Sequence, residues 1–156
     1  MQNLGNLLDL LLSAKIDFVL IGGFASVIHG SSMVTHDLDI CILFDPEHVE
    51  QIRECLRPYH PKHRMTPKRL SFLDYPGDLS NLKNLYLETD LGVLDIVGNI
   101  DGVGSFKQVS KNAMKIEIYG KKCKVISIDD LIASKKSIGR DKDLAVVRQL
   151  EAIKKG

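Results

Sequence analysis

The fold is decided by the stretch Ile21-Gly-Gly-Phe-Ala-Ser-Val-Ile-His-Gly-Ser-Ser-Met-Val-Thr-His-Asp-Leu-Asp-Ile40. A short buried strand over 17–21 leads into it and ends at the glycine pair Gly22-Gly23, because adjacent glycines punctuate regular structure. A short helix is expected over 24–29. A second strand is expected over 37–44, since its residues alternate between two faces. The chain therefore predicts a strand, a glycine turn, a helix and a strand that opens with two acids.

Asp37 and Asp39 are the two acids at the start of that second strand. They are two residues apart, so both carboxylates leave the same face of the strand. Neighbouring carboxylates repel each other, and the arrangement is costly unless a cation lies between them. Mg²⁺ binds one or two carboxylates together with substrate phosphates. The pair therefore predicts a site for Mg²⁺, or for Mn²⁺ in its place.

A third acid, Asp95, lies inside the apolar segment Val93-Leu-Asp-Ile-Val97. An acid in the middle of a strand is unfavourable by propensity and by burial. It needs a cation, a hydrogen-bond network or a solvent-filled cleft. If this strand lies beside the strand over 37–44, the three acids share one face and can hold two metal ions.

Several residues are candidates for binding phosphate. Glycines after a strand let backbone N–H groups approach a phosphate closely, although such a pair is as often only a turn. Ser26 in the following helix can donate a hydrogen bond to phosphate or simply pack the helix on the sheet. The basic residues near the C-terminus can bind nucleotide or pair with Asp141 or Asp143. The candidates for nucleotide binding are Gly22, Gly23, Ser26, Lys135, Arg140 and Lys142.

The rest of the chain predicts a mixed sheet flanked by helices, an α/β (α+β) fold, in a single domain over residues 1–156. Segment 57–69 is rich in Lys, Arg, His and Pro and contains no acid, so we expect a loop that could contact an acceptor substrate. Helices are expected over the first dozen residues and over 45–56, 129–138 and 141–154. Hairpins are expected over 85–97 and 115–126, the second turning at Gly120-Lys121, with a short edge strand near 70–73.

Composition excludes several classes of protein. Lys and Arg total 21 and Asp and Glu total 20, a net charge of +1, which excludes a generally basic nucleic-acid coat and an acidic tail. No apolar run approaches the roughly 20 residues of a membrane helix, so no membrane partner is expected. Cys41, Cys55 and Cys123 are odd in number and far apart. They predict reduced thiols and a cytoplasmic location.

The order of glycine pair, acid pair and later acid resembles the DNA polymerase beta-type nucleotidyltransferase superfamily. The segment from Asp130 to Asp143 is similar to the tail of small bacterial nucleotidyltransferase-like proteins, including the AbiEii-related group. The resemblance implies the nucleotidyltransferase fold and a Mg²⁺-dependent transfer of a nucleoside monophosphate from an NTP to a hydroxyl or phosphate. It implies that Asp37, Asp39 and Asp95 are catalytic and bind the metal. The acceptor stays open among RNA, protein and a small molecule.

One position departs from this pattern. These relatives commonly have an arginine two residues before the threonine that precedes the acid pair, and here that residue is Met33, before Thr35. The alternative is therefore a weakly active or inactive nucleotidyltransferase-like binding module with a protein partner, for example in a toxin–antitoxin or phage-defence pair. Haloacid-dehalogenase phosphatases also use Asp-x-Asp, but their apolar strand precedes the first acid, whereas here it follows Asp37.

Overall fold

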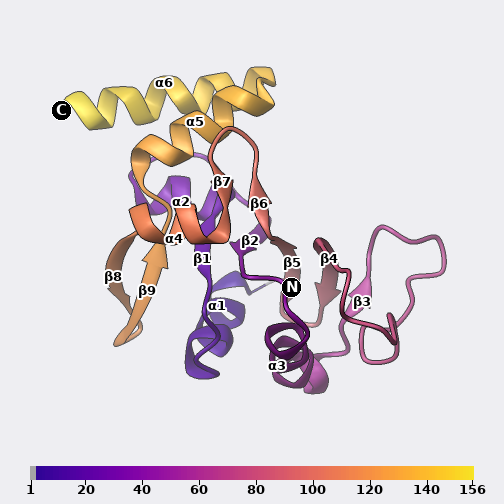
Figure 1. Cartoon of the computed structure of the whole chain (residues 1–156). Coiled ribbons are helices and arrows are strands. Elements are labelled where there is room, and N and C mark those ends of the chain that lie inside the picture. Colours follow the sequence, from indigo (N-terminus) through magenta and orange to yellow (C-terminus); the bar gives the residue numbers. More distant parts are fainter. Residues whose placement is uncertain (1–2) are drawn as a thin grey trace.

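A seven-stranded mixed sheet forms the centre of the molecule in a computed structural model that describes residues 3–156 (Figure 1). Its strands are, in spatial order, β3 (Lys62–His63), β4 (Asn84–Thr89), β5 (Gly92–Val97), β2 (Asp37–Cys41), β1 (Val19–Ile21), β9 (Lys121–Val125) and β8 (Met114–Ile118). A separate small hairpin joins β6 (Asn99–Ile100) and β7 (Gly104–Ser105). The helices are α1 (Leu4–Ser13), α2 (Gly22–Ile28), α3 (Pro46–Leu56), the 3-10 helix η1 (Arg57–Tyr59), α4 (Phe106–Asn112), α5 (Ile128–Ile138) and α6 (Asp141–Lys155).

The pairing of β2 with β5 determines where the acids lie. The two strands run parallel, and Asp39 lies opposite Asp95 in the register. On its other side, β2 pairs antiparallel with β1, where Asp39 lies opposite Ile21. The predicted adjacency of the two acid-bearing strands is therefore confirmed, and Asp37, Asp39 and Asp95 belong to one face of the sheet.

The opposite face of these two strands is fully apolar and buried. Leu38, Ile40, Leu94 and Ile96 alternate with the acids and have no exposed surface. Helix α1 contacts both β2 and β5 and packs against α3, so these helices cover the apolar face. Burying a side chain of this size contributes about 1.5–3 kcal/mol. The core thus fixes which face of the sheet carries the acids.

Most of the predicted elements are present. Both hairpins form, and the second turns at Tyr119-Gly120, one residue earlier than expected. Both turn residues have positive φ, 55° and 74°, as a tight two-residue hairpin requires. Asp45 and Ser127 cap α3 and α5, because each side chain accepts a hydrogen bond from the backbone N–H group three residues on.

Some boundaries differ from the prediction. The first helix begins at Leu4, and residues 1–2 of its predicted range lie outside the described residues. Helix α2 begins directly at Gly22, and strand β2 ends at Cys41 rather than at residue 44. The edge strand is β3, not 70–73, where Ser71 makes only an isolated bridge to Lys62. Helix α4 and the β6–β7 hairpin were not expected, because segments so short carry too little periodicity. Across residues 3–156, no helix combines the length and apolarity that crossing a membrane requires.

The glycine pair lets the turn into α2 lie directly against the acid-bearing segment. Gly22 has a φ of +68°, and a Cβ on it would lie 2.1 Å from Oδ2 of Asp39. A Cβ on Gly23 would lie 2.8 Å from Oγ1 of Thr35. Both contacts are shorter than any side chain tolerates. Glycine is therefore required here by space, and at Gly22 also by backbone conformation.

We predict that Gly22→Ala destabilises the fold by more than about 1 kcal/mol, because the methyl group adds steric overlap with Asp39 to the strain of a positive φ. Gly120→Ala is the matched control. Its φ is +74°, but a Cβ there meets nothing within 4 Å, so it measures the backbone strain alone. Urea denaturation compares the two variants, and an equal loss of stability in both would contradict a steric role for Asp39.

Candidate active site

A cleft of about 500 Å³ lies over the acid-bearing face of the sheet. It is lined by Gly22 at the start of α2, Asp39 of β2, Asp95 of β5, Lys135 of α5 and Arg140, which precedes α6. The cavity thus brings together residues that the sequence analysis proposed for three roles. Asp39 and Asp95 were proposed as acids of the site, Gly22 as a glycine that lets phosphate approach, and Lys135 and Arg140 as cations. The sheet supplies the negative charge, and the C-terminal helices supply the positive charge.

The acids in this cleft are crowded and poorly neutralised. Burial, followed by the charges of Asp95 and Asp37, raises the pKa of Asp39 to about 6, although Lys135 and Arg64 act in the opposite direction. Burial also raises the pKa of Asp95, and a hydrogen bond from Arg64 only partly offsets this effect. Burial and the neighbouring carboxylates therefore together disfavour the charged form of Asp39.

Asp37 and Asp39 present two carboxylates on one face of β2, a pair of ligands that would suit one Mg²⁺ ion. Within residues 3–156, no three His, Cys, Asp or Glu side chains are grouped so that they could hold a metal ion by themselves. Mg²⁺ does not need such a cage, because it commonly takes one or two carboxylates plus phosphate oxygens and water. The donor set on one face of β2 and the raised pKa of Asp39 agree with a cation at this position. The sequence-based hypothesis of two ions on three acids stays a prediction.

Arg64 belongs to segment 57–69, which the sequence predicted as an acceptor-contacting loop, but its contact with Asp95 was not predicted. It follows β3 directly, and its Nε and Nη2 atoms donate to Asp95 at 3.0 and 2.5 Å from Oδ1 and Oδ2. Its guanidinium also lies over the ring of Tyr86, 5.6 Å from the ring centre. The absence of acids from segment 57–69 indicated in part that Arg64 pairs with an acid elsewhere, because the basic residues of this segment have no acidic partner within it. The sequence could not show that Asp95 is one of those partners.

The other two arginines of segment 57–69 pair with acids outside the cleft. Arg57 binds Glu54 on the preceding helix, and Arg69 binds Glu88 on β4. Of the three arginines, Arg64 alone pairs with an acid of the cleft, and the role of segment 57–69 in acceptor binding stays a prediction.

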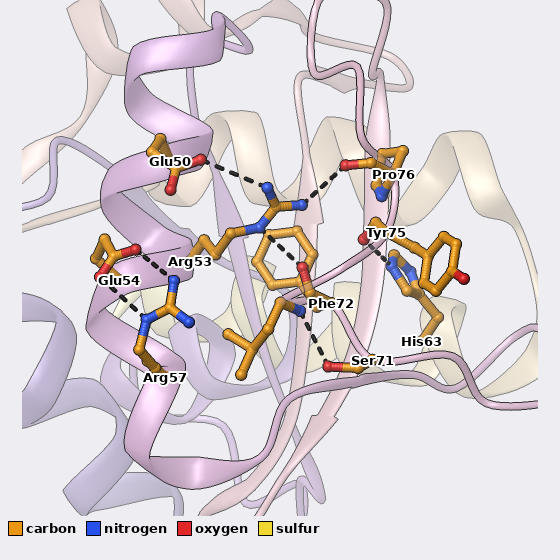
Figure 2. A network of polar contacts seen from close by, with 10 residues as sticks. Glu50, Arg53, Glu54, Arg57, His63, Ser71, Phe72, Tyr75 and Pro76 are labelled. Atoms are coloured by element: carbon orange, nitrogen blue, oxygen red, sulfur yellow. Dashed lines mark hydrogen bonds and ion pairs between the residues drawn. The ribbon is translucent and has the colours of Figure 1, made fainter.

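A buried arginine anchors the chain that follows Arg64 (Figure 2). Arg53 of α3 donates to the carbonyl oxygens of Phe72 at 2.8 Å and Pro76 at 3.0 Å, and its guanidinium lies 4.9 Å from the centre of the Phe72 ring. His63 Nε2 donates to the carbonyl oxygen of Tyr75 at 2.7 Å. These contacts satisfy three backbone carbonyl groups and tie the segment to α3 and β3, at the edge of the sheet from which Arg64 projects.

The other end of the cleft is organised by Asp143, which is fully buried. Arg140 donates to it through Nε at 2.6 Å, and Nζ of Lys135 lies 3.6 Å from its Oδ1. Burial raises the pKa of Asp143, but the hydrogen bond from Arg140 and the charges of Lys135 and Arg140 outweigh burial and lower it. The alternative in which Arg140 pairs with Asp143 is therefore confirmed. A role of Lys135 and Arg140 in nucleotide binding stays a prediction.

Four candidate residues are not among those that line the cleft: Gly23, Ser26, Asp37 and Lys142. Ser26 is fully buried, and its hydroxyl donates to the carbonyl oxygen of Gly22, at 3.2 Å. This contact favours the packing role over the expected contact with phosphate. Lys142 is exposed on α6 and is also absent from the residues that line the cavity. Of the six residues expected to bind nucleotide, the cleft contains Gly22, Lys135 and Arg140.

The sequence matches no protein-family model and no curated protein. The fold, however, is similar to three solved structures. The lincomycin-bound lincosamide antibiotic adenylyltransferase LnuA has a TM-score of 0.63 and 18% identity, over 96% of this chain and 95% of that one. A putative nucleotidyltransferase from Thermotoga maritima has a TM-score of 0.59 and 18% identity, over 94% and 91%. An antigenic nucleotidyltransferase-like protein from Paracoccidioides brasiliensis has a TM-score of 0.54 and 16% identity, over 96% and 72%.

At such low identities the likeness shows the fold alone. The chain has a nucleotidyltransferase-like fold, with the mixed sheet and flanking helices that the sequence predicted. Membership of the AbiEii-related group stays a prediction.

We predict that Asp39→Asn stabilises the protein at pH 7.5 and changes its stability little at pH 4. The folded pKa of Asp39, about 6, lies above its ordinary value of 3.8. The folded state therefore keeps a proton that the unfolded state releases between these values, so this group lowers stability as pH rises from 4 to 6. The amide removes a cost of about 3 kcal/mol at pH 7.5.

Urea denaturation at the two pH values measures the effect. Asp74→Asn, which removes an exposed carboxylate outside the cleft, is the control for the loss of one negative charge. An equal gain from Asp39→Asn at both pH values would contradict the crowding of the acids.

Proposed function

We propose that this chain is a metal-dependent nucleotidyltransferase that moves a nucleoside monophosphate from an NTP to a hydroxyl or phosphate acceptor and releases pyrophosphate. One observation carries the proposal: Asp39 and Asp95 lie side by side on the sheet, in a cleft that also contains Lys135 and Arg140, and Asp37 lies on the same face of the sheet. A fold alone does not determine a function, so the proposal rests on this cluster of charges.

The residues of the cleft divide the chemical work. Asp37 and Asp39 would hold Mg²⁺ or Mn²⁺, which supplies positive charge to the triphosphate and lowers the pKa of the attacking hydroxyl. Lys135 and Arg140 would bind phosphate oxygens, and Gly22-Gly23 leave the backbone open to their approach. Asp95 would accept the proton of the acceptor hydroxyl as its oxygen bonds to the α-phosphorus and the bond to pyrophosphate breaks. Positioning and charge neutralisation are the main demands of such a transfer.

The acceptor is left as an RNA, a protein or a small molecule, and residues 1–156 are taken as one catalytic domain. We assign the reaction to the cytoplasm, because Cys41, Cys55 and Cys123 are all free thiols.

A second candidate function is a binding module without turnover, as one partner in a toxin–antitoxin or phage-defence pair of the AbiEii-related kind. The observation that favours it is the ion pair of Arg64 with Asp95, which occupies both carboxylate oxygens of the proposed base. In addition, Met33, and not an arginine, lies near Gly23, where its sulfur would be 3.7 Å from a Cβ. Pyrophosphate release from a panel of NTPs, with and without Mg²⁺, separates the two candidates.

We predict that an NTP added with Mg²⁺ or Mn²⁺ raises the melting temperature of the protein, because a ligand that binds only the folded state stabilises it. At a ligand concentration of 100 times Kd the gain is about 2.7 kcal/mol. The double variant Asp37→Asn, Asp39→Asn should lose this shift although it folds. Differential scanning fluorimetry measures both proteins, and the same shift in the double variant would exclude the two acids as ligands.

We predict that Asp95→Asn keeps NTP affinity within several-fold but lowers kcat by about a hundredfold or more, the usual size of an acid–base contribution. The amide keeps the shape of the side chain and cannot accept the proton. Steady-state pyrophosphate release gives kcat, and a nucleotide-induced melting shift gives the affinity. If the wild-type chain binds NTP without turnover and Asp95→Asn binds it identically, the binding module is the correct alternative.

A further inference from the structure

Arg64 and Gly22 lie on opposite sides of the acid cluster. In the sheet, β3 and β4 lie on one side of β5 and β2, and β1 lies on the other. Gly22 directly follows β1 and approaches Asp39, whereas Arg64 directly follows β3 and lies over Tyr86 of β4. The proposed triphosphate side of the cleft, at Gly22, is therefore not the side on which Arg64 lies. Arg64 faces the acids from the side left for the acceptor.

The backbone at Arg64 is fixed while its side chain ends in a partly open position. Its amide N–H donates to the carbonyl oxygen of Tyr86 at 3.0 Å, and the adjacent His63 is held by Tyr75. The side chain is 27% exposed, and that of Asp95 is 14% exposed. A change of partner by the guanidinium would therefore involve the side chain and its contacts with Tyr86 and Met65, while the backbone of the strand stays paired.

The chemistry of this ion pair limits what can displace Asp95. A guanidinium is a planar fork that binds carboxylate and phosphate in a bidentate manner. Asp95 is a carboxylate already held beside it by the fold, so a carboxylate from solution has no advantage. A phosphate group carries up to two negative charges and three strong acceptor oxygens, and is the better competitor.

We propose that Arg64 recognises a phosphate group on the acceptor and that this contact releases Asp95. With no such acceptor bound, Arg64 holds both oxygens of Asp95 and keeps the carboxylate from its proposed task. With a phosphorylated acceptor bound, the guanidinium moves to the phosphate, and Asp95 becomes free to take the proton of the acceptor hydroxyl. The role of Asp95 rests on the proposed function, whereas the exchange of partners by Arg64 does not.

Inorganic phosphate is the probe, and the NMR signal of the Arg64 Nε–H group reports on its partner. We expect phosphate to shift this signal in the wild type with weak affinity. In Asp95→Asn the competing charge is gone, so phosphate should bind at least tenfold more tightly. In Arg64→Gln the corresponding phosphate binding, followed on neighbouring backbone amides, should be lost. These two variants act in opposite directions, so misfolding of one leaves the other informative.

Arg69→Gln is the matched control, because Arg69 belongs to the same basic segment but pairs with Glu88 outside the cleft. It should bind phosphate as the wild type does. Equal phosphate affinity in the wild type, Asp95→Asn and Arg64→Gln would overturn the proposal, as would an Arg64 signal that phosphate does not move.

No NTP or metal is needed in this experiment, so its outcome is independent of turnover. If the phosphate titrations behave as expected and no pyrophosphate is released from any NTP, the recognition role of Arg64 stands and the transferase function fails. If pyrophosphate is released but Arg64 ignores phosphate, the transferase function stands and the recognition role fails.

Discussion

The repulsion between the carboxylates on one face of β2 and β5 is the constraint that the register of these strands and the packing of the core have to overcome. The register that sets Asp39 beside Asp95 is determined from the other face, where Leu38 and Ile40 lie beside Leu94 and Ile96 in the core. A slip of one residue in either strand would turn its acids into the core and its apolar side chains into the cleft. The hydrophobic effect therefore maintains an arrangement that electrostatics alone would disperse.

The neighbours of the acids reduce this repulsion without removing it. Arg64 neutralises Asp95, and Lys135 acts on Asp39 but is itself held by the buried Asp143. The pKa of Asp39 remains raised to about 6 in spite of both cations. Such a local loss of stability is typical of sites that bind a charged ligand, because the ligand supplies the missing charge.

Sequence reasoning succeeded where the signal was local. The same-face spacing of Asp37 and Asp39, the isolated acid in an apolar strand and the turn residues of the hairpins are all readable within a few positions. The adjacency of β2 and β5 was the condition on which a shared site for the three acids depended, and the structure meets it. Fold and acid cluster were predictable for this reason, even though no solved structure reported above exceeds 18% identity.

Sequence reasoning failed where a contact joins distant segments or where burial decides a role. The pairing of Arg64 with Asp95 spans 31 positions, and no periodicity connects them. Ser26 has the same sequence signature whether its hydroxyl faces a phosphate or the backbone of its own helix, and only its burial separates the two. Asp143 resembles an ordinary helix-terminal acid until α5 and α6 enclose it.

The ion pair of Arg64 bears on both candidate functions. In a binding module that binds no metal, an arginine of the protein would neutralise the acids permanently, and no external cation would be needed to reduce their repulsion. Among the acids of residues 3–156, however, Arg64 hydrogen-bonds only Asp95, and burial, Asp95 and Asp37 still raise the pKa of Asp39. Acids that the cations of the protein do not fully neutralise attract an external cation. If that cation arrives bound to a triphosphate, the negative triphosphate is complementary to Lys135 and Arg140 on the wall of the cleft. The incomplete neutralisation thus favours binding of a metal–nucleotide, which both candidate functions allow, so turnover is the property that separates them.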